Sequence, residues 1–527
     1  MKTIQIPSFI KNMGHRVLGH ILNIEEEKAL DVINGNLALD PQRLAVLSAF
    51  IQICRQIRMR SIDQANVDFS FFNGLTQIVQ NERHIFNIWR EQLGGERYSP
   101  TNLDALVEIA ARLALEIYPL SLIKFPLDNP LFVNTFFHQG LILYGLNEHK
   151  LLLKKIMEDP SISKIFTQVG KNELETQGQY SASTGRGGSI QLAVFPTTLI
   201  ANAYELMRLR GIISQEKLVE AIEEVVNMIR QVAEGNLIKV PAFVGFHNVG
   251  LNDFDYLEIE WGKIRVYNEE FMELIPQEAR PSILGGEKKF LGFILEVEYP
   301  YKVDFEPWQE NADWPHELEE GRQYLANLKE NVSLTFALSV ERDPPIGITP
   351  AWTLIVDPLS QGTSISWSPR PLSPMPHYLF CSDQQESIKH WASLIKGSRD
   401  EKIRIAIRRI VSSINERMNP IDGFVDAVIA WVNLFGGEAE LSYRISISIA
   451  KLLEESEECR LKLQKKVVDY YNDRSKIIHG VKEITYDEAV RKRNECLSIA
   501  LASMKKLYEE YQNLLLDPGR SKKLALQ

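Results

Sequence analysis

The sequence predicts an α+β multidomain protein with a helical N-terminal region, a small, mainly antiparallel β domain and a C-terminal helical bundle. The chain has 527 residues, which is long enough for two to four domains. Apolar residues recur at intervals of three and four in the first part and again from about residue 385, whereas between these parts they recur at intervals of two. We therefore expect domains at 1–235, 236–384 and 385–527.

The overall composition is that of a soluble globular protein, with 45% hydrophobic and 24% charged residues. No apolar run approaches the roughly 18 residues of a membrane span, and the N-terminus lacks the apolar segment of a signal peptide. The cysteines are far apart and form no C-x-x-C pair, which indicates reduced thiols and no zinc site. We expect a cytoplasmic protein with no metal, no other cofactor and no membrane partner.

The charge is unevenly distributed. The net charge of −10 argues against indiscriminate nucleic-acid binding. From Glu401 to the end, however, 22 Lys and Arg face 19 Asp and Glu, while the rest of the chain has 37 against 50. The C-terminal part is therefore the one better suited to an anionic ligand.

In the N-terminal region, the spacing of apolar residues predicts helices at Leu103–Tyr118 and Gln215–Val232. The segment Gly178–Ser189 is rich in glycine and serine, which is typical of a flexible, solvated loop. It lacks the G-x-x-x-x-G-K-[ST] pattern of a phosphate-binding P-loop. We therefore assign it no phosphate-binding role.

The middle region alternates apolar and polar residues from about Asn236. A turn is expected at Gly262-Lys263, and the clearest alternation, at 332–340, predicts a strand. Other strands are expected around residues 257–261, 264–266, 293–299, 352–356 and 365–367. A proline-rich segment, 369–376, would lead out of this domain.

Five helices are expected in the roughly 120 residues of the C-terminal bundle. One apolar stripe is formed by Ile403, Ile407, Ile410 and Ile414. Asn419-Pro420 begins a second helix and Gly436-Gly437 ends it. A third helix runs from about 439 to 453 and a fourth from about 460 to 479. A capping box at Thr485–Glu488 opens the fifth.

The fourth helix carries an arginine within its apolar stripe. Leu463, Val467, Tyr471, Arg474 and Ile478 are spaced by three or four residues and share one face. Arginine is almost never fully buried without a partner. Arg474 therefore faces a bound anion, a subunit interface, or a carboxylate in a structural ion pair, for which the candidates are Asp422, Asp426 and Asp473.

His479 follows Arg474 by five residues, about 7.5 Å along the helix axis and about 140° around it. Gly480 would end the helix there and leave the imidazole partly exposed. A histidine at this position either interacts favourably with the helix dipole or transfers protons at a site. A fixed cation that holds phosphate oxygens beside a group that titrates near neutrality suits a phosphodiester substrate.

The segment Arg474–Gly480, RSKIIHG, resembles the R-x4–6-H motif of HEPN domains. The longer form Y-x-x-R-S-x-I-x-H-G, from Tyr471 to Gly480, is similar to the Apea-like branch of that family. The upstream segments DGFVDAVIAWVNLF, at Asp422–Phe435, and ELSYRISISIAKLL, at Glu440–Leu453, also fit. The resemblance covers roughly residues 334–515.

The resemblance implies a helical bundle that pairs about a two-fold axis, so that two such motifs line one cleft. Active members of the family are metal-independent endoribonucleases, many of them in anti-phage defence or toxin systems. Carried over, Arg474 would orient and neutralise the scissile phosphate, and His479 would transfer a proton during attack by the ribose 2′-OH. Ser475 and Tyr471 would orient substrate. RNA supplies its own nucleophile, so positioning, charge neutralisation and a proton carrier suffice.

One position departs from the family pattern. Related sequences often carry a glutamate where this chain has Val432, and Asp426 or Asn433 would have to replace it in orienting the arginine. The sequence thus leaves three hypotheses. They are a homodimeric ribonuclease whose N-terminal region senses a phage or protein trigger, a non-catalytic HEPN scaffold that binds RNA, nucleotide or protein, and an interaction protein in which Arg474 forms an internal ion pair.

Overall fold

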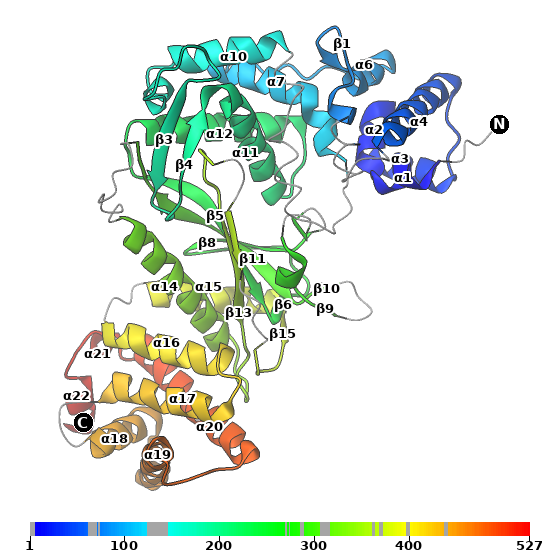
Figure 1. The fold of residues 1–527 in the computed structure, drawn as a ribbon. Helices are drawn as coiled ribbons and strands as arrows, with labels where there is room; N and C mark the ends of the chain where they lie inside the picture. Colours follow the sequence, from blue (N-terminus) through cyan, green and yellow to red (C-terminus); the bar gives the residue numbers. More distant parts are fainter. Residues whose placement is uncertain are drawn as a thin grey trace.

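The computed structural model describes residues 6–61, 71, 74–123, 146–268, 271–272, 275–284, 289–305, 317–360, 364–367, 373–396, 401–436 and 441–526. It combines helices with small, mainly antiparallel sheets and ends in a helical C-terminal region, which confirms the coarse fold class. The N-terminal helices lie at one end of the molecule, the largest sheet lies in the middle, and the C-terminal helices lie at the other end (Figure 1).

The N-terminal region is mostly helical, as the spacing of its apolar residues predicts. The expected helices at 103–118 and 215–232 are observed, and Asp104 and Ser214 cap their N-termini through side-chain oxygens. The helices are α1 (Ser8–Asn12), α2 (His15–Leu22), α3 (Glu26–Asn34), α4 (Pro41–Ser61), α6 (Ile85–Gln92), α7 (Ala105–Ser121), α10 (Asn147–Glu158), α11 (Phe195–Leu209) and α12 (Gln215–Ala233). A short hairpin, β1 (Val79–Gln80) and β2 (Arg83–His84), precedes α6.

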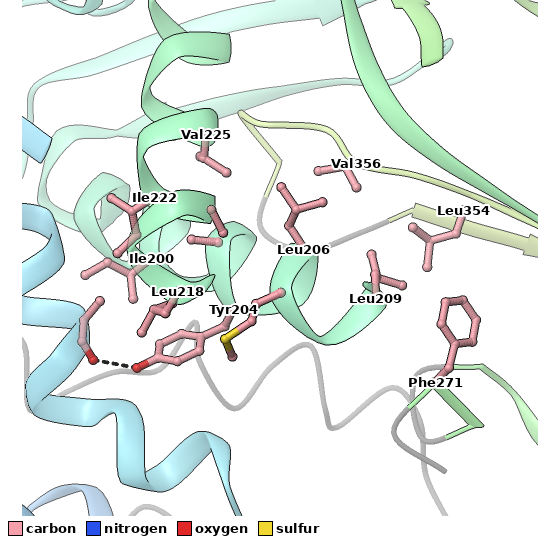
Figure 2. Packing of buried hydrophobic residues seen from close by; sticks show 14 of the residues in the cluster. Ile200, Tyr204, Leu206, Leu209, Leu218, Ile222, Val225, Phe271, Leu354 and Val356 are labelled. Atoms are coloured by element: carbon pink, nitrogen blue, oxygen red, sulfur yellow. Dashed lines mark hydrogen bonds between the residues drawn. The ribbon is translucent and has the colours of Figure 1, made fainter. Parts of the chain in front are cut away.

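Helix α11 joins the N-terminal helices to the central sheet. Figure 2 shows Leu206 and Leu209 of α11 directed toward Leu354 and Val356, while the Tyr204 hydroxyl donates a hydrogen bond of 2.5 Å to the Ala114 carbonyl of α7. These side chains belong to one hydrophobic cluster that runs from the first helices into the sheet. The helical region and the sheet therefore share a continuous core.

The prediction of a flexible loop at 178–189 is wrong. This segment forms a hairpin of β3 (Gln177–Ala182) and β4 (Gly187–Gln191), and β12 (Val303–Asp304) extends it. Glycine is required by close packing, because a Cβ on Gly178 would lie 2.0 Å from the Ile165 carbonyl oxygen. The small residues that suggested a loop instead allow another backbone to approach the strand.

The largest sheet has six antiparallel strands in the order β14-β13-β5-β11-β8-β7. The predicted turn lies two residues earlier, at Glu260-Trp261, because Gly262 already begins a strand. The strands are β5 (Ile238–His247), β7 (Tyr256–Ile259), β8 (Gly262–Val266), β11 (Gly292–Tyr301), β13 (Thr349–Ile355) and β14 (Ser364–Trp367). Two smaller pairs are β6 (Val249–Leu251) with β15 (Tyr378–Phe380), which is parallel, and β9 (Ile283–Leu284) with β10 (Lys289–Phe290).

The prediction of a strand at 332–340 is also wrong, because this segment belongs to helix α14 (Glu317–Leu338). Val332 and Phe336 contribute to the core beneath the sheet, whereas Leu334 and Leu338 contribute to the core of the C-terminal bundle. Each pair has the helical spacing of four, and the two pairs are offset by two residues. Burial on two sides of one helix thus produced the alternation that is typical of a strand.

The C-terminal bundle follows the predicted order of helices. Ile403, Ile407, Ile410 and Ile414 are all buried in its core, and Asn419 caps α17 by accepting a hydrogen bond from the Ile421 amide. Its helices are α15 (Gln385–Lys396), α16 (Glu401–Asn415), α17 (Pro420–Phe435), α18 (Leu441–Leu453), α19 (Glu457–Ile478), α20 (Tyr486–Glu509), α21 (Gln512–Leu515) and α22 (Arg520–Leu526).

Polar contacts fix the bundle to the sheet. The Asn415 side chain at the end of α16 accepts a 2.8 Å hydrogen bond from the Ile348 amide, just before β13. Arg408 of α16 also binds Glu330 of α14 at 2.7 Å. Within the described part of the chain, no helix is long and apolar enough to cross a membrane.

Candidate functional site

The candidate site lies where α19 ends, at the outer end of the bundle in Figure 1. His479 is the C-cap residue of α19, and Gly480 follows it with a φ of +68°. The Gly480 amide donates to the Ile477 carbonyl and the Val481 amide to the Lys476 carbonyl, at 3.0 and 2.8 Å. This is a Schellman motif, so glycine ends the helix as predicted and leaves His479 exposed.

Replacement of Gly480 by alanine is expected to lower the free energy of unfolding by about 1 kcal/mol, because a Cβ is unfavourable at a positive φ. A Cβ at this position would meet no atom within 4 Å, so steric clash contributes nothing. Urea unfolding measures the effect. Gly480→Asn is the control and should lose less, since asparagine tolerates the left-handed conformation. Equal losses in the two variants would contradict this account.

Arg474 is half-buried on the inner side of α19 and has no ion pair or hydrogen bond among the described residues. Its Nε is buried without a partner, whereas its two terminal nitrogens are not among the buried unpartnered atoms. The tip of the guanidinium group is therefore open to solvent. A partly desolvated charge without a counter-ion is costly, and a bound anion would offset that cost.

The carboxylates proposed as partners of Arg474 are engaged elsewhere. Asp426 binds Arg409 and Arg417 at 2.7 and 2.6 Å, and Asp473 binds Lys482 at 2.6 Å and also Lys492. Burial of Asp473 favours its neutral form, but the two lysines outweigh this effect and lower its pKa. Asp422 is exposed in the first turn of α17. The internal ion pair that the sequence left open is therefore wrong for all three.

Neither Asp426 nor Asn433 has a hydrogen bond or ion pair with Arg474 in the described part of the chain. The Asp426 side chain is only 4% exposed and is occupied by its two arginines. The Asn433 amide donates a 2.9 Å hydrogen bond to the Ile429 carbonyl of its own helix. The expectation that either residue orients Arg474 or contacts substrate therefore finds no support in their contacts.

Asp426→Asn is expected to lower the free energy of unfolding by about 2 kcal/mol, because it removes a charged acceptor from two arginines. The loss is limited because Arg409 and Arg417 are 38% and 40% exposed, so water can solvate their guanidinium groups when the carboxylate is removed. Chemical denaturation provides the measurement. Asp422→Asn, at the exposed position on the same helix, serves as control. A change below about 0.5 kcal/mol, the size of ordinary surface effects, would refute this structural role for Asp426.

The remaining predicted residues surround Arg474 on α19. Tyr471 is partly buried against the bundle core, Ser475 is half-buried, and His479 is exposed. Four cavities on the described part of the chain are lined by Arg83, Thr353, Lys28 and Glu223, respectively, among other residues. Neither Arg474 nor His479 lines any of these four. Arg474 is half-buried and His479 is exposed, so the pair lies near the surface of the chain where α19 ends.

Sequence reasoning missed the charged groups that are placed by the tertiary structure. Arg409 and Arg417 converge on Asp426, and Arg493 is 4% exposed with its Cδ 2.6 Å from the position that a Cβ on Gly423 would occupy. In the segment 422–426, Gly423 is the only residue whose type indicates the close approach of Arg493. Among the described residues, no group of three or more His, Cys, Asp or Glu side chains is arranged to hold a metal ion.

Comparisons with known proteins add no family assignment. No protein-family model matches the chain, and no curated protein or solved structure is significantly similar to it.

Proposed function

We propose that the protein is a metal-independent endoribonuclease of the HEPN type that acts as a homodimer. The observation that carries the proposal is Arg474, an arginine without a counter-ion among the described residues, which is followed five residues later by an exposed histidine, His479. The guanidinium group would hold the scissile phosphate, and the imidazole would transfer the proton of the attacking 2′-OH. The resemblance to Apea-like HEPN domains suggests a role in anti-phage defence or as a toxin.

The surface around α19 supports pairing with a second copy. Only Val467 and Tyr470 are buried in this helix of 22 residues. Leu461, Ile478 and Val481 are 60%, 49% and 76% exposed. Ile478 and Val481 lie within two residues of His479, and exposed apolar side chains beside the Arg/His pair suit an interface. A second motif across that interface would complete the cleft that one chain lacks.

The test is incubation of total RNA with the wild-type protein in EDTA. Cleavage with 2′,3′-cyclic phosphate ends is expected, because the ribose 2′-OH is the proposed nucleophile. Light scattering of the same preparation should give the mass of a dimer. Intact RNA after incubation with a confirmed dimer would reject the nuclease proposal.

The second candidate function is a non-catalytic HEPN scaffold that binds RNA, a nucleotide or a protein partner. The observation that favours it concerns Val432, which stands where related sequences often carry a glutamate. Asp426 is bound to arginines other than Arg474, and the Asn433 amide donates to its own helix, so neither supplies a substitute for that glutamate. The same assay separates the two candidates. Retention of labelled RNA on a filter without cleavage would favour the scaffold.

A further inference from the structure

A cavity of about 390 Å³ lies beside α6 and α7, at the end of the molecule opposite α19 (Figure 1). A volume of this size is typical of a small-molecule site. Its wall is strongly polar and includes four arginines, Arg83, Arg90, Arg97 and Arg112. The cavity lies outside the candidate nuclease site, so a ligand bound here would be independent of RNA cleavage.

Two of these arginines are already neutralised. Arg83 donates to both carboxylate oxygens of Glu91 at 2.8 and 2.6 Å and to Glu116 at 3.2 Å. Arg97 donates to the same Glu116 at 3.2 Å. Two cations and two carboxylates thus form a closed network along one side of the cavity.

Arg90 and Arg112 differ because neither has an ion pair or a hydrogen bond in the described part of the chain. The Nε of each is buried without a partner, while the terminal nitrogens are not among the buried unpartnered atoms. Since both residues line the same cavity, these nitrogens are available to its contents. Burial lowers the pKa of the Arg90 guanidinium, which is the effect expected of a charge that lacks a counter-ion.

The backbone holds Arg90 in place. Gly94 has φ of +82°, and a Cβ on Gly95 would lie 2.5 Å from Arg90 Cγ and 2.9 Å from the Arg90 carbonyl oxygen. Any other residue at Gly95 would displace the side chain. Arg90 also lines the neighbouring hollow, in which Lys28 and Arg43 pair with Glu25 and Asp40 at 2.9 and 2.5 Å. Among the described residues, Arg90 is therefore a cation without an ion pair where the two hollows meet.

Three further carboxylates line the cavity. Glu96 and Glu108 are exposed, and Glu148 is half-buried. Exposed carboxylates are screened by water and accept hydrogen bonds from hydroxyl or amino groups. The cavity therefore offers two guanidinium groups for an anion and carboxylates for donors on the rest of the same ligand.

We propose that this cavity binds a small molecule that carries a phosphate group. Arg90 and Arg112 bind the phosphate oxygens, to which the planar guanidinium fork is well matched. The glutamates accept hydrogen bonds from hydroxyl or amino groups of the remainder. The ligand class is thus a phosphate ester of a polar metabolite, such as a sugar phosphate or a nucleotide.

Calorimetric titration of the full chain tests the proposal with four probes, which are inorganic phosphate, ribose 5-phosphate, adenosine 5′-monophosphate and adenosine. The two esters are expected to bind more tightly than inorganic phosphate, and adenosine is expected not to bind. Equal binding of inorganic phosphate and the esters would support the arginine site but reject the role of the glutamates. Failure of all three phosphate-containing probes at millimolar concentration would overturn the proposal.

Variants locate the binding. Arg90→Gln and Arg112→Gln are each expected to weaken ester binding by about 10-fold or more. Lys150→Gln, at an exposed position on α10, removes the same charge outside the cavity and should change the Kd by less than about 2-fold. Wild-type affinity in both arginine variants, or an equal loss in Lys150→Gln, would place the ligand elsewhere.

Gly95→Ala provides a second route to the same result, because it displaces Arg90 without changing the charge. It is expected to weaken binding as much as Arg90→Gln does. Thermal unfolding without ligand checks the fold, and Arg90→Gln should unfold at no lower temperature than wild type since it removes an uncompensated charge. Undiminished binding in a folded Gly95→Ala protein would count against the proposed position of Arg90.

Discussion

Arg474→Ala is expected to reduce RNA cleavage in EDTA by about 10²- to 10³-fold, because in the proposed mechanism its charge stabilises the developing negative phosphate. The protein should stay folded, since Arg474 has no ion pair or hydrogen bond among the described residues to lose. Lys476→Ala is the matched control. It removes a cation two residues away, from an exposed position on the same helix, and should cleave at close to the wild-type rate.

His479→Ala completes this experiment and tests proton transfer rather than charge. General acid–base catalysis contributes about 10²- to 10⁴-fold, so a loss of that size is expected. His390→Ala is the control, because His390 is also exposed in the C-terminal bundle but lies beside Glu509. Cleavage that persists in His479→Ala would remove the residue from the mechanism, whereas equal losses in the control variants would show that the assay reports folding.

Acidification from pH 7 to pH 5 is expected to destabilise the protein by about 2 kcal/mol for each of three buried histidines. Burial lowers the pKa of His20, His84 and His247 to about 4. Hydrogen bonds partly oppose this shift, because the Asn87 side-chain oxygen accepts from His20 and the Leu75 carbonyl accepts from His84, whereas Arg90 reinforces the shift for His20.

The sign follows from proton binding in the two states. The unfolded histidines titrate near pH 6.5, so between pH 6.5 and pH 4 the unfolded state binds more protons than the folded state. Stability is therefore complete above pH 6.5 and falls as the pH falls toward 4. The depressed pKa of carboxylates such as Asp104, whose largest cause is a hydrogen bond from Arg230, acts in the same direction at lower pH.

Urea unfolding at pH 7 and pH 5 measures this dependence. His84→Gln should unfold with a difference between the two pH values that is smaller by about 2 kcal/mol. His479→Gln, at an exposed position, should keep the wild-type difference. A stability that is unchanged between pH 7 and pH 5 would show that these three histidines do not remain neutral in the folded protein.

The C-terminal bundle was the part that sequence reasoning described best. The stripe from Ile403 to Ile414, the cap at Asn419 and the glycine at Gly480 are local signals, and each is read within one helix. Arg474 was singled out for the same reason, because a cation within an apolar stripe is visible in one dimension.

The errors have a common physical cause. The alternation at 332–340 was produced by two cores on two sides of α14, and Gly178 was required by the approaching backbone of Ile165. Neither neighbour is close in sequence. The local pattern of apolar residues indicates that parts of an element are buried, but it does not indicate which neighbouring elements bury them.

The sequence by itself determined the order of the five expected helices of the bundle, the cap that begins α17, the glycine that ends α19 and the place of Arg474 within an apolar stripe. Only the tertiary structure decided which charges are neutralised, because an ion pair depends on distances between groups far apart in the chain. The sequence allows Asp426 to pair with Arg474, yet in the folded chain Asp426 binds Arg409 and Arg417. In the same way, Arg90 and Arg112 stand 22 positions apart in the sequence, and folding brings them to one cavity, where neither forms an ion pair with any described residue.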